Sequence, residues 1–216
     1  MRKRVMTAGR AAALGVVMCG LLAVPSTAYA QVEATGVIGG LLGGDLNNLI
    51  SGTASIKTTF DNGPLYGFRV GWIGGFIGAE GSFVYSPSGV KISAPSSPIE
   101  LDGKVNYTEG NFLVIPIPGP VSPFFTIGAG WHRYTLNLNV ATLATDEVKI
   151  EKFGWNFGGG IKINIKGLTL RGEVRDHLTK VGPDDFDVAD IAEEIGFNGE
   201  QTLHNVEISG GIGVRF

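Results

Sequence analysis

The chain ends in NVEISGGIGVRF, residues 205–216, where apolar side chains alternate with polar or minimal ones. One face of an extended strand here carries the apolar set Val206, Ile208, Gly210, Ile212, Val214 and Phe216. The other face carries Asn205, Glu207, Ser209, Gly211, Gly213 and Arg215. Successive side chains of a strand point to opposite sides of the sheet, so this period of two predicts a strand with two chemically different faces.

The same alternation recurs upstream, most clearly in LTLRGEVR (168–175) and FGWNFGGGIKINI (153–165). Followed back along the chain, it predicts eight strands. Their bounds are Val32–Gly44, Pro64–Ile73, Phe76–Pro87, Lys104–Ile117, Pro123–Leu138, Ile150–Ile165, Leu168–Thr179 and Thr202–Phe216. The first of these alternates poorly, which leaves Ala54–Phe60 as a second candidate for the opening strand. We prefer the earlier segment because it preserves an even strand count.

The predicted connections alternate in length. The long ones cover residues 45–63, 88–103, 139–149 and 180–201, and the short ones cover 74–75, 118–122 and 166–167. Short turns at one end and long loops at the other are typical of an outer-membrane barrel with both termini on the periplasmic side. We therefore predict an all-β fold, an eight-stranded antiparallel up-and-down transmembrane β-barrel.

Alternation alone does not tell whether the apolar face points to lipid or to a soluble core. The glycine positions favour an apolar face that points to lipid. Glycine clusters on the polar faces beside charges of both signs, as expected where these faces line a narrow lumen. These glycines are Gly154, Gly158, Gly160, Gly211 and Gly213. The opposite faces hold many aromatic residues, several near strand ends where membrane girdles lie. They are Tyr66, Phe68, Trp72, Phe83, Tyr85, Phe125, Trp131, Phe153, Trp155 and Phe216.

Composition narrows the class of protein. Of 216 residues, 34 are glycine, and 44% are hydrophobic against 17% charged. Glycine costs about 1 kcal/mol per interior helical position relative to alanine, so a long helical protein is excluded. The formal net charge of -3 argues against nucleic acid as a partner.

Residues 1–30 read as a cleaved signal peptide, which leaves 31–216 as the barrel domain. A basic start (Arg2, Lys3 and Arg4) precedes an apolar stretch over 11–24, and Ala28-Tyr29-Ala30 matches a cleavage site. A lipoprotein anchor at Cys19 is the competing interpretation, although such sites prefer a small residue where Met18 stands. Cys19 is the single cysteine, so the exported domain has no disulfide.

Residues 31–216 resemble the small outer-membrane β-barrels grouped with opacity proteins and the transmembrane domain of OmpA. The resemblance rests on YGFRVGW (66–72), GAEGSF (78–83), GAGW (128–131) and the ending GVRF (213–216). It implies that Phe216 is the terminal signal read by the outer-membrane assembly machinery. No peptidoglycan-binding domain follows the barrel, so the anchoring role of longer relatives is not implied.

Eight strands enclose a lumen just wide enough for their own side chains, so we expect it to be plugged. The charges on the polar faces are then expected to form interior ion pairs, since unpaired buried charges cost several kcal/mol. They are Arg69, Glu80, Arg171, Glu173, Arg175, Glu207 and Arg215. A narrow gated proton or ion path is the functional alternative.

Three histidines raise the question of catalysis. His177 closes one predicted strand and His204 opens the next, so both are expected near the outer rim. Some outer-membrane barrels are lipid A deacylases with a Ser-His-Glu arrangement, but here Val206 follows two residues after His204. His132 is interpreted as an interior polar group. The sequence thus predicts no enzyme and no cofactor.

The last long loop is acidic. Asp184, Asp185, Asp187 and Asp190 are weak candidates for divalent-cation binding, but their spacing matches no calcium-loop pattern. Apolar residues at helical spacing favour a solvated amphipathic helical turn over 184–195 instead.

We therefore expect a filled barrel with a structural, envelope-integrity or surface-contact role through four outer loops. Its expected partners are outer-membrane lipid, lipopolysaccharide and the assembly machinery, with a surface partner that the sequence does not identify. The alternatives are a gated channel, a soluble lipocalin-type ligand-binding barrel and, last, a lipid-modifying enzyme.

Overall fold

The computed structural model of the protein describes residues 31–43, 45–46, 57–60, 62–88, 90–93, 98–138, 146–181 and 201–216. Strands make up nearly all of this part of the chain. They are β1 (Gln31–Leu42), β2 (Asp45–Leu46), β3 (Lys57–Phe60), β4 (Gly63–Gly74), β5 (Ile77–Ser86), β6 (Val90–Ser93), β7 (Pro98–Val114), β8 (Val121–Leu138), β9 (Asp146–Ile165), β10 (Leu168–Val181) and β11 (Gln201–Arg215). In the described ranges, no helix has the length and apolar character needed to cross a membrane.

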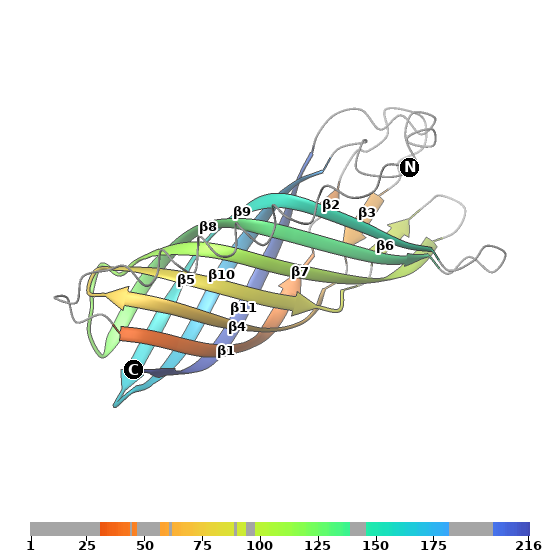
Figure 1. The fold of residues 1–216 in the computed structure, drawn as a ribbon. Coiled ribbons are helices and arrows are strands. Elements are labelled where there is room, and N and C mark those ends of the chain that lie inside the picture. The colour runs from red at the N-terminus through yellow and green to blue at the C-terminus, as the bar shows by residue number, and fades with distance from the viewer. Residues whose placement is uncertain are drawn as a thin grey trace, which may run out of the picture.

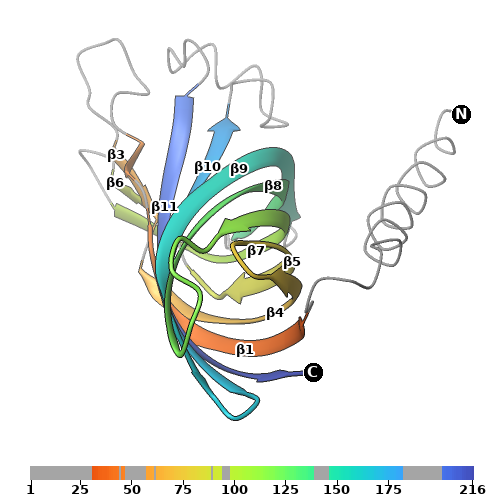
Figure 2. The same ribbon diagram turned by 90° about the vertical axis from the view of Figure 1, so that its left-hand side faces the viewer.

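Eight of these strands form a closed antiparallel ring in the order β1-β4-β5-β7-β8-β9-β10-β11 (Figures 1 and 2). The ring closes where β1 pairs with β11, from Glu33 opposite Arg215 to Leu42 opposite Val206. At the closing end, Val32 and Phe216 exchange two backbone hydrogen bonds of 3.2 and 2.9 Å. The predicted eight-stranded barrel is confirmed.

All eight predicted strands are present in the ring, including the uncertain first one, because β1 pairs with both β4 and β11. The rival opening segment supplies β3, which lies in a small extension, β2-β3-β6, attached to the start of β7. The extension stands beyond the rim at the end of the barrel where β1 ends and β4 begins, which we call the long-connection end (Figure 1).

The three short connections lie together at the opposite end, which we call the short-turn end. At the β9–β10 turn, Lys166 and Gly167 have φ values of 44° and 87°. Positive φ at both central residues is the geometry of a two-residue type I′ turn, which follows the twist of the flanking strands. The β4–β5 turn falls at Gly75-Phe76, one residue later than predicted.

The two faces of every strand differ as the sequence pattern predicts. On β11, Ile212 is 64% exposed on the outside, whereas Glu207 is fully buried in the lumen. Seven of the ten predicted outward aromatics, among them Tyr66, Phe125 and Trp155, are exposed on this outer surface, and Trp72, Phe83 and Tyr85 are half-buried. Since a soluble lipocalin-type barrel needs an apolar interior and a polar exterior, that alternative is wrong.

Glycine on the inner faces allows neighbouring strands to approach each other closely. A Cβ at Gly158 would lie 2.8 Å from the Cα of Arg175, and one at Gly211 would lie 2.9 Å from the backbone oxygen of Gly36. Real Cβ atoms do not come so close to backbone, so these positions admit only glycine without movement of a neighbouring strand.

Candidate functional site: the barrel lumen

The lumen is filled in layers along the barrel axis. Towards the long-connection end lies an apolar group that we call the outer cluster. It consists of Leu41, Leu65, Val84, Val105, Tyr107, Tyr134, Ile150, Val181 and Leu203. Towards the short-turn end lies the inner cluster, Leu113, Ile115 and Phe124, with Ile73 packed against it. The charged side chains of the lumen therefore lie between two apolar layers or beside the short-turn mouth.

Three arginines and four glutamates from five strands form the central layer, which we call the ion network. Its members are Arg69, Arg171, Arg175, Glu80, Glu109, Glu173 and Glu207, all buried. Arg175 lies 2.7 Å from Glu173 and 3.3 Å from Glu80, and Arg171 lies 2.8 Å from Glu173. Arg69 pairs with both Glu173 and Glu207. Such pairing offsets the loss of hydration that each buried charge suffers.

Six of the seven lumen charges expected from the sequence meet in this network, and Arg215 does not. Arg215 lies near the short-turn end, where its Nη2 is 2.9 Å from Glu33. Sequence reasoning missed Glu109, Glu33 and Lys162 as partners. All three lie on the lumen-facing side of predicted strands by the period of two, so the same alternation could have identified them.

The ion network holds one carboxylate more than guanidinium groups, and His177 stands next to the surplus. Its Nδ1 is 2.8 Å from Glu109 Oε1 and its Nε2 is 3.2 Å from Glu207 Oε2. A carboxylate oxygen only accepts hydrogen bonds, so both ring nitrogens donate and the imidazole carries a positive charge. The ring of Tyr107 stacks on His177 with 4.1 Å between centroids.

His132 completes this group from the neighbouring strand β8. Its Nε2 is 2.9 Å from the same Glu109 Oε1, and its Nδ1 is 2.6 Å from Thr179 Oγ1. Both histidines are fully buried. The side-chain donor atoms of Glu109, His132 and His177 all lie within 4.8 Å of one another.

His177 and His204, which the sequence placed near one rim, lie one register position apart but on opposite faces of the barrel wall. They are neighbours across the β10–β11 pair, but His177 points into the lumen while His204 points outward to Asp176, 2.8 Å away. Ser209, on the lumen side, donates to Glu207 and not to a histidine. Within the described strands, no serine and histidine therefore form a nucleophile–base pair.

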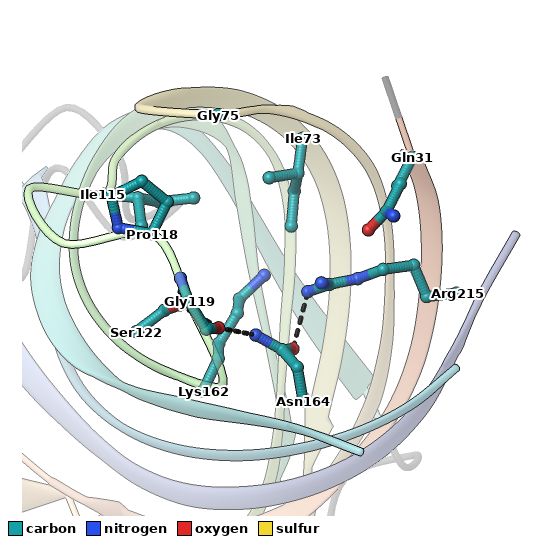
Figure 3. Close-up of a pocket in the computed structure, with 10 residues that line it drawn as sticks. All are labelled: Gln31, Ile73, Gly75, Ile115, Pro118, Gly119, Ser122, Lys162, Asn164 and Arg215. Carbon is teal, nitrogen blue, oxygen red and sulfur yellow. Dashed lines mark hydrogen bonds between the residues drawn. The ribbon is translucent and has the colours of Figure 1, made fainter. Parts of the chain in front are cut away.

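A cavity of about 190 Å³ opens at the short-turn end (Figure 3). Figure 3 shows Arg215 and Asn164 meeting across this mouth, where Arg215 Nη2 donates to Asn164 Oδ1 at 2.7 Å. Below them Lys162 Nζ lies 2.7 Å from Glu33 Oε1. The ring of Phe124 separates Lys162, at 5.5 Å from its centroid, from Arg171 of the ion network, at 4.5 Å. The lining of the mouth is mixed, because Ile73, Ile115 and Pro118 lie beside the polar side chains.

Two further predictions concern positions away from the lumen. The acidic candidates Asp184, Asp185, Asp187 and Asp190 lie outside the described residues, as does the predicted signal peptide, 1–30. Phe216 is 77% exposed on the outer surface, with its backbone paired to Val32.

Comparison with known proteins gives a consistent result. Residues 15–216 match the family described as outer membrane protein beta-barrel domain. The fold is similar to the crystal structure of Neisserial surface protein A (NspA), with a TM-score of 0.52 at 15% identity over 87% of this chain and 97% of that one. It is also similar to the outer membrane protein OprG from Pseudomonas aeruginosa, with a TM-score of 0.55 at 15% identity over 88% and 97%. A search of curated protein sequences gave no match.

Proposed function

Since the chain belongs to the outer membrane protein beta-barrel domain family, we propose that it is a sealed barrel of the Gram-negative outer membrane. In this proposal it serves envelope integrity or surface contact through the connections at its long-connection end. Outer-membrane lipid and lipopolysaccharide surround its apolar outer surface. The chain reaches that membrane through a signal peptide removed after Ala30, so sequencing of the mature protein is expected to start at Gln31.

The filled lumen is the observation that carries the proposal. An ion or solute crossing the barrel would have to displace the outer cluster, the ion network and the inner cluster in turn. Opening the network breaks several buried ion pairs at once, and leaving even one such charge unpaired costs about 3–5 kcal/mol. Beyond the cavity at the short-turn end, the buried inner cluster and the ion network fill the lumen.

Conductance in planar lipid bilayers tests the seal. The refolded barrel is expected to give no single-channel steps, while a general porin in the same bilayers provides the positive control. Steady steps from the wild-type chain would overturn the proposal in favour of a gated channel.

The arrangement of the connections supports a surface role. The strand ends that the four long connections join lie at one end of the barrel together with the extension β2-β3-β6, while the short turns, Gln31 and Phe216 lie at the other. The name of Neisserial surface protein A places a barrel of the same fold at a cell surface.

Epitope tags on intact cells test this orientation. A tag inserted within 182–200 is expected to be labelled on intact cells, whereas a tag at the turn 166–167 is expected to need permeabilisation first. The reverse pattern would place the long connections in the periplasm and remove the basis for surface contact.

We also propose that the barrel is not an enzyme. Ser209 donates to Glu207, and His204, which is paired with Asp176, has no serine hydrogen-bonded to it among the described residues, so the nucleophile–base contact of a hydrolase is not formed there.

A further inference from the structure

We propose that Glu109, His132 and His177 form a binding site for one divalent transition metal ion inside the lumen, with Zn²⁺ as the best-matched ion. The ligands are Glu109 Oε1, His132 Nε2 and His177 Nδ1. The inference is independent of the sealed-barrel proposal, because a bound ion neither requires nor prevents conduction. Its residues differ from the weak cation candidates Asp184, Asp185, Asp187 and Asp190 of the sequence analysis.

The carboxylate oxygen of Glu109 lies between the two ring nitrogens, and the three atoms are within 4.8 Å of one another. The carboxylate oxygen lies 2.9 Å from His132 Nε2 and 2.8 Å from His177 Nδ1. Zinc holds nitrogen and oxygen ligands at about 2.0–2.2 Å, which sets neighbouring ligand atoms about 3.3 Å apart in a tetrahedron. To admit the ion, the oxygen withdraws by about 0.5 Å from each ring and the two ring nitrogens, which lie within 4.8 Å of each other, move to about 3.3 Å apart.

The groups behind the ligands hold the rings as metal-binding histidines are held. The far nitrogen of His132 faces Thr179 Oγ1 at 2.6 Å, and that oxygen is 2.8 Å from the hydroxyl of Tyr134. The far nitrogen of His177 faces Glu207, which is fixed by Arg69. Each partner accepts the remaining ring proton and so leaves the nitrogen nearest Glu109 free for a metal.

The backbone makes the site rigid. Glu109, His132 and His177 come from β7, β8 and β10, three strands of one closed barrel. The Tyr107 ring lies flat on His177 and edge-on to His132, at 4.1 and 4.7 Å between centroids. Ligands fixed in this way lose little conformational entropy on binding.

The donor set selects the class of ion. Two imidazole nitrogens and one carboxylate suit Zn²⁺ and neighbouring transition metals, whereas Ca²⁺ and Mg²⁺ prefer oxygen ligands and Cu(I) prefers thiolates. The metal displaces the Nδ1 proton of His177, and His132 moves its proton to Nδ1. One ion is thus taken up and one proton is released to solvent.

Metal content measured on refolded protein tests the site. Because the ligands are fully buried, the ion is expected to load while the barrel folds. The exported chain, purified from outer membranes, is unfolded and refolded in detergent with Zn²⁺ or Co²⁺ and then dialysed. We expect one equivalent of bound metal, and with Co²⁺ a visible absorption band that the metal-free protein lacks.

Matched variants locate the ion. Glu109→Gln, His132→Gln and His177→Gln are each expected to lose the bound metal, whereas the outward His204→Gln is expected to retain it. Thr179→Val, which removes a positioning group without removing a ligand, is expected to weaken binding by about 10–100-fold. Heat-modifiable migration on gels verifies that each variant folds.

Two results would overturn the proposal. One is wild-type protein that refolds fully in the presence of Zn²⁺ or Co²⁺ and retains neither, since this measurement needs no variant. The other is that His204→Gln loses the ion while folded Glu109→Gln retains it. This outcome would show that the ion binds at the outer surface. Either result would leave the buried group as a hydrogen-bonded cluster only.

Discussion

Arg175 illustrates how a narrow barrel accommodates charge. Its fully buried guanidinium group lies within 3.4 Å of Glu80, Glu109 and Glu173. A single cation thus compensates several carboxylates that share the same water-poor space. Its removal would leave those carboxylates facing one another without hydration.

We therefore predict that Arg175→Met strongly destabilises the barrel. Removing one partner of a buried ion pair typically costs about 3–5 kcal/mol. Equilibrium unfolding by urea in lipid vesicles, followed by tryptophan fluorescence, measures the free energy of unfolding. Arg133→Met is the control, because Arg133 is 52% exposed and lies 3.2 Å from Glu151 on the outer surface. Its expected cost is below about 1 kcal/mol, and equal costs for the two variants would contradict the argument.

Phe216 offers a second prediction at the residue scale. Its side chain is exposed at the end of β11, so truncation removes little packing from the folded barrel. The family resemblance implies instead that assembly depends on it. Phe216→Ala is expected to lower the amount of folded protein in the outer membrane without lowering its stability once folded. Phe76→Ala, at an exposed phenylalanine of the β4–β5 turn, serves as control. Similar yields of the two variants would argue against a terminal signal.

Within a strand, a glycine on the inner face and a glycine on the outer face differ in the space that surrounds them. Gly158 of β9 faces the lumen, and a Cβ there would approach the backbone of β10. Gly172 of β10 faces outward, and a Cβ there would meet nothing within 4 Å. The two positions have the same residue type, and they differ in the face of the strand on which they lie.

This difference predicts opposite outcomes for one chemical change. Gly158→Ala is expected to destabilise the barrel by about 1–3 kcal/mol, because β9 and β10 must move apart. Gly172→Ala is expected to change stability by no more than about 1 kcal/mol, with a gain possible from reduced freedom of the unfolded chain. Urea unfolding in the same vesicles compares the two. A Gly158→Ala variant as stable as Gly172→Ala would show that the inner face has spare room.

At the scale of the whole molecule, closure between β1 and β11 leaves the ring without a free edge. A closed hydrogen-bonded ring resists detergent at room temperature, whereas boiling opens it. We predict that the protein from an outer-membrane fraction migrates differently on gels before and after heating. It is also expected to stay with the membrane in carbonate. A carbonate-soluble protein without a mobility shift would contradict membrane insertion.

Much of the barrel was predictable because a strand's two faces are a local property of the sequence. Alternation in 205–216 and 153–165 indicated which side chains face inward before any pairing was known. Connection lengths then indicated the up-and-down order. The same parity placed Arg69 and Glu207 in the lumen, but it did not tell which charge meets which, since that depends on stagger between strands.

The sequence by itself determined the strands, their two faces, the order of long and short connections and the polar character of the lumen. Each follows from a period of two residues or from turn chemistry, which act over short stretches of chain. Only the tertiary structure decided that Glu109, His132 and His177 meet at one oxygen, and that Lys162 pairs with Glu33 from the far end of the chain. Closing eight tilted strands into a ring fixes the stagger of all strands together. The level of each side chain along the barrel axis is therefore not encoded in any single segment.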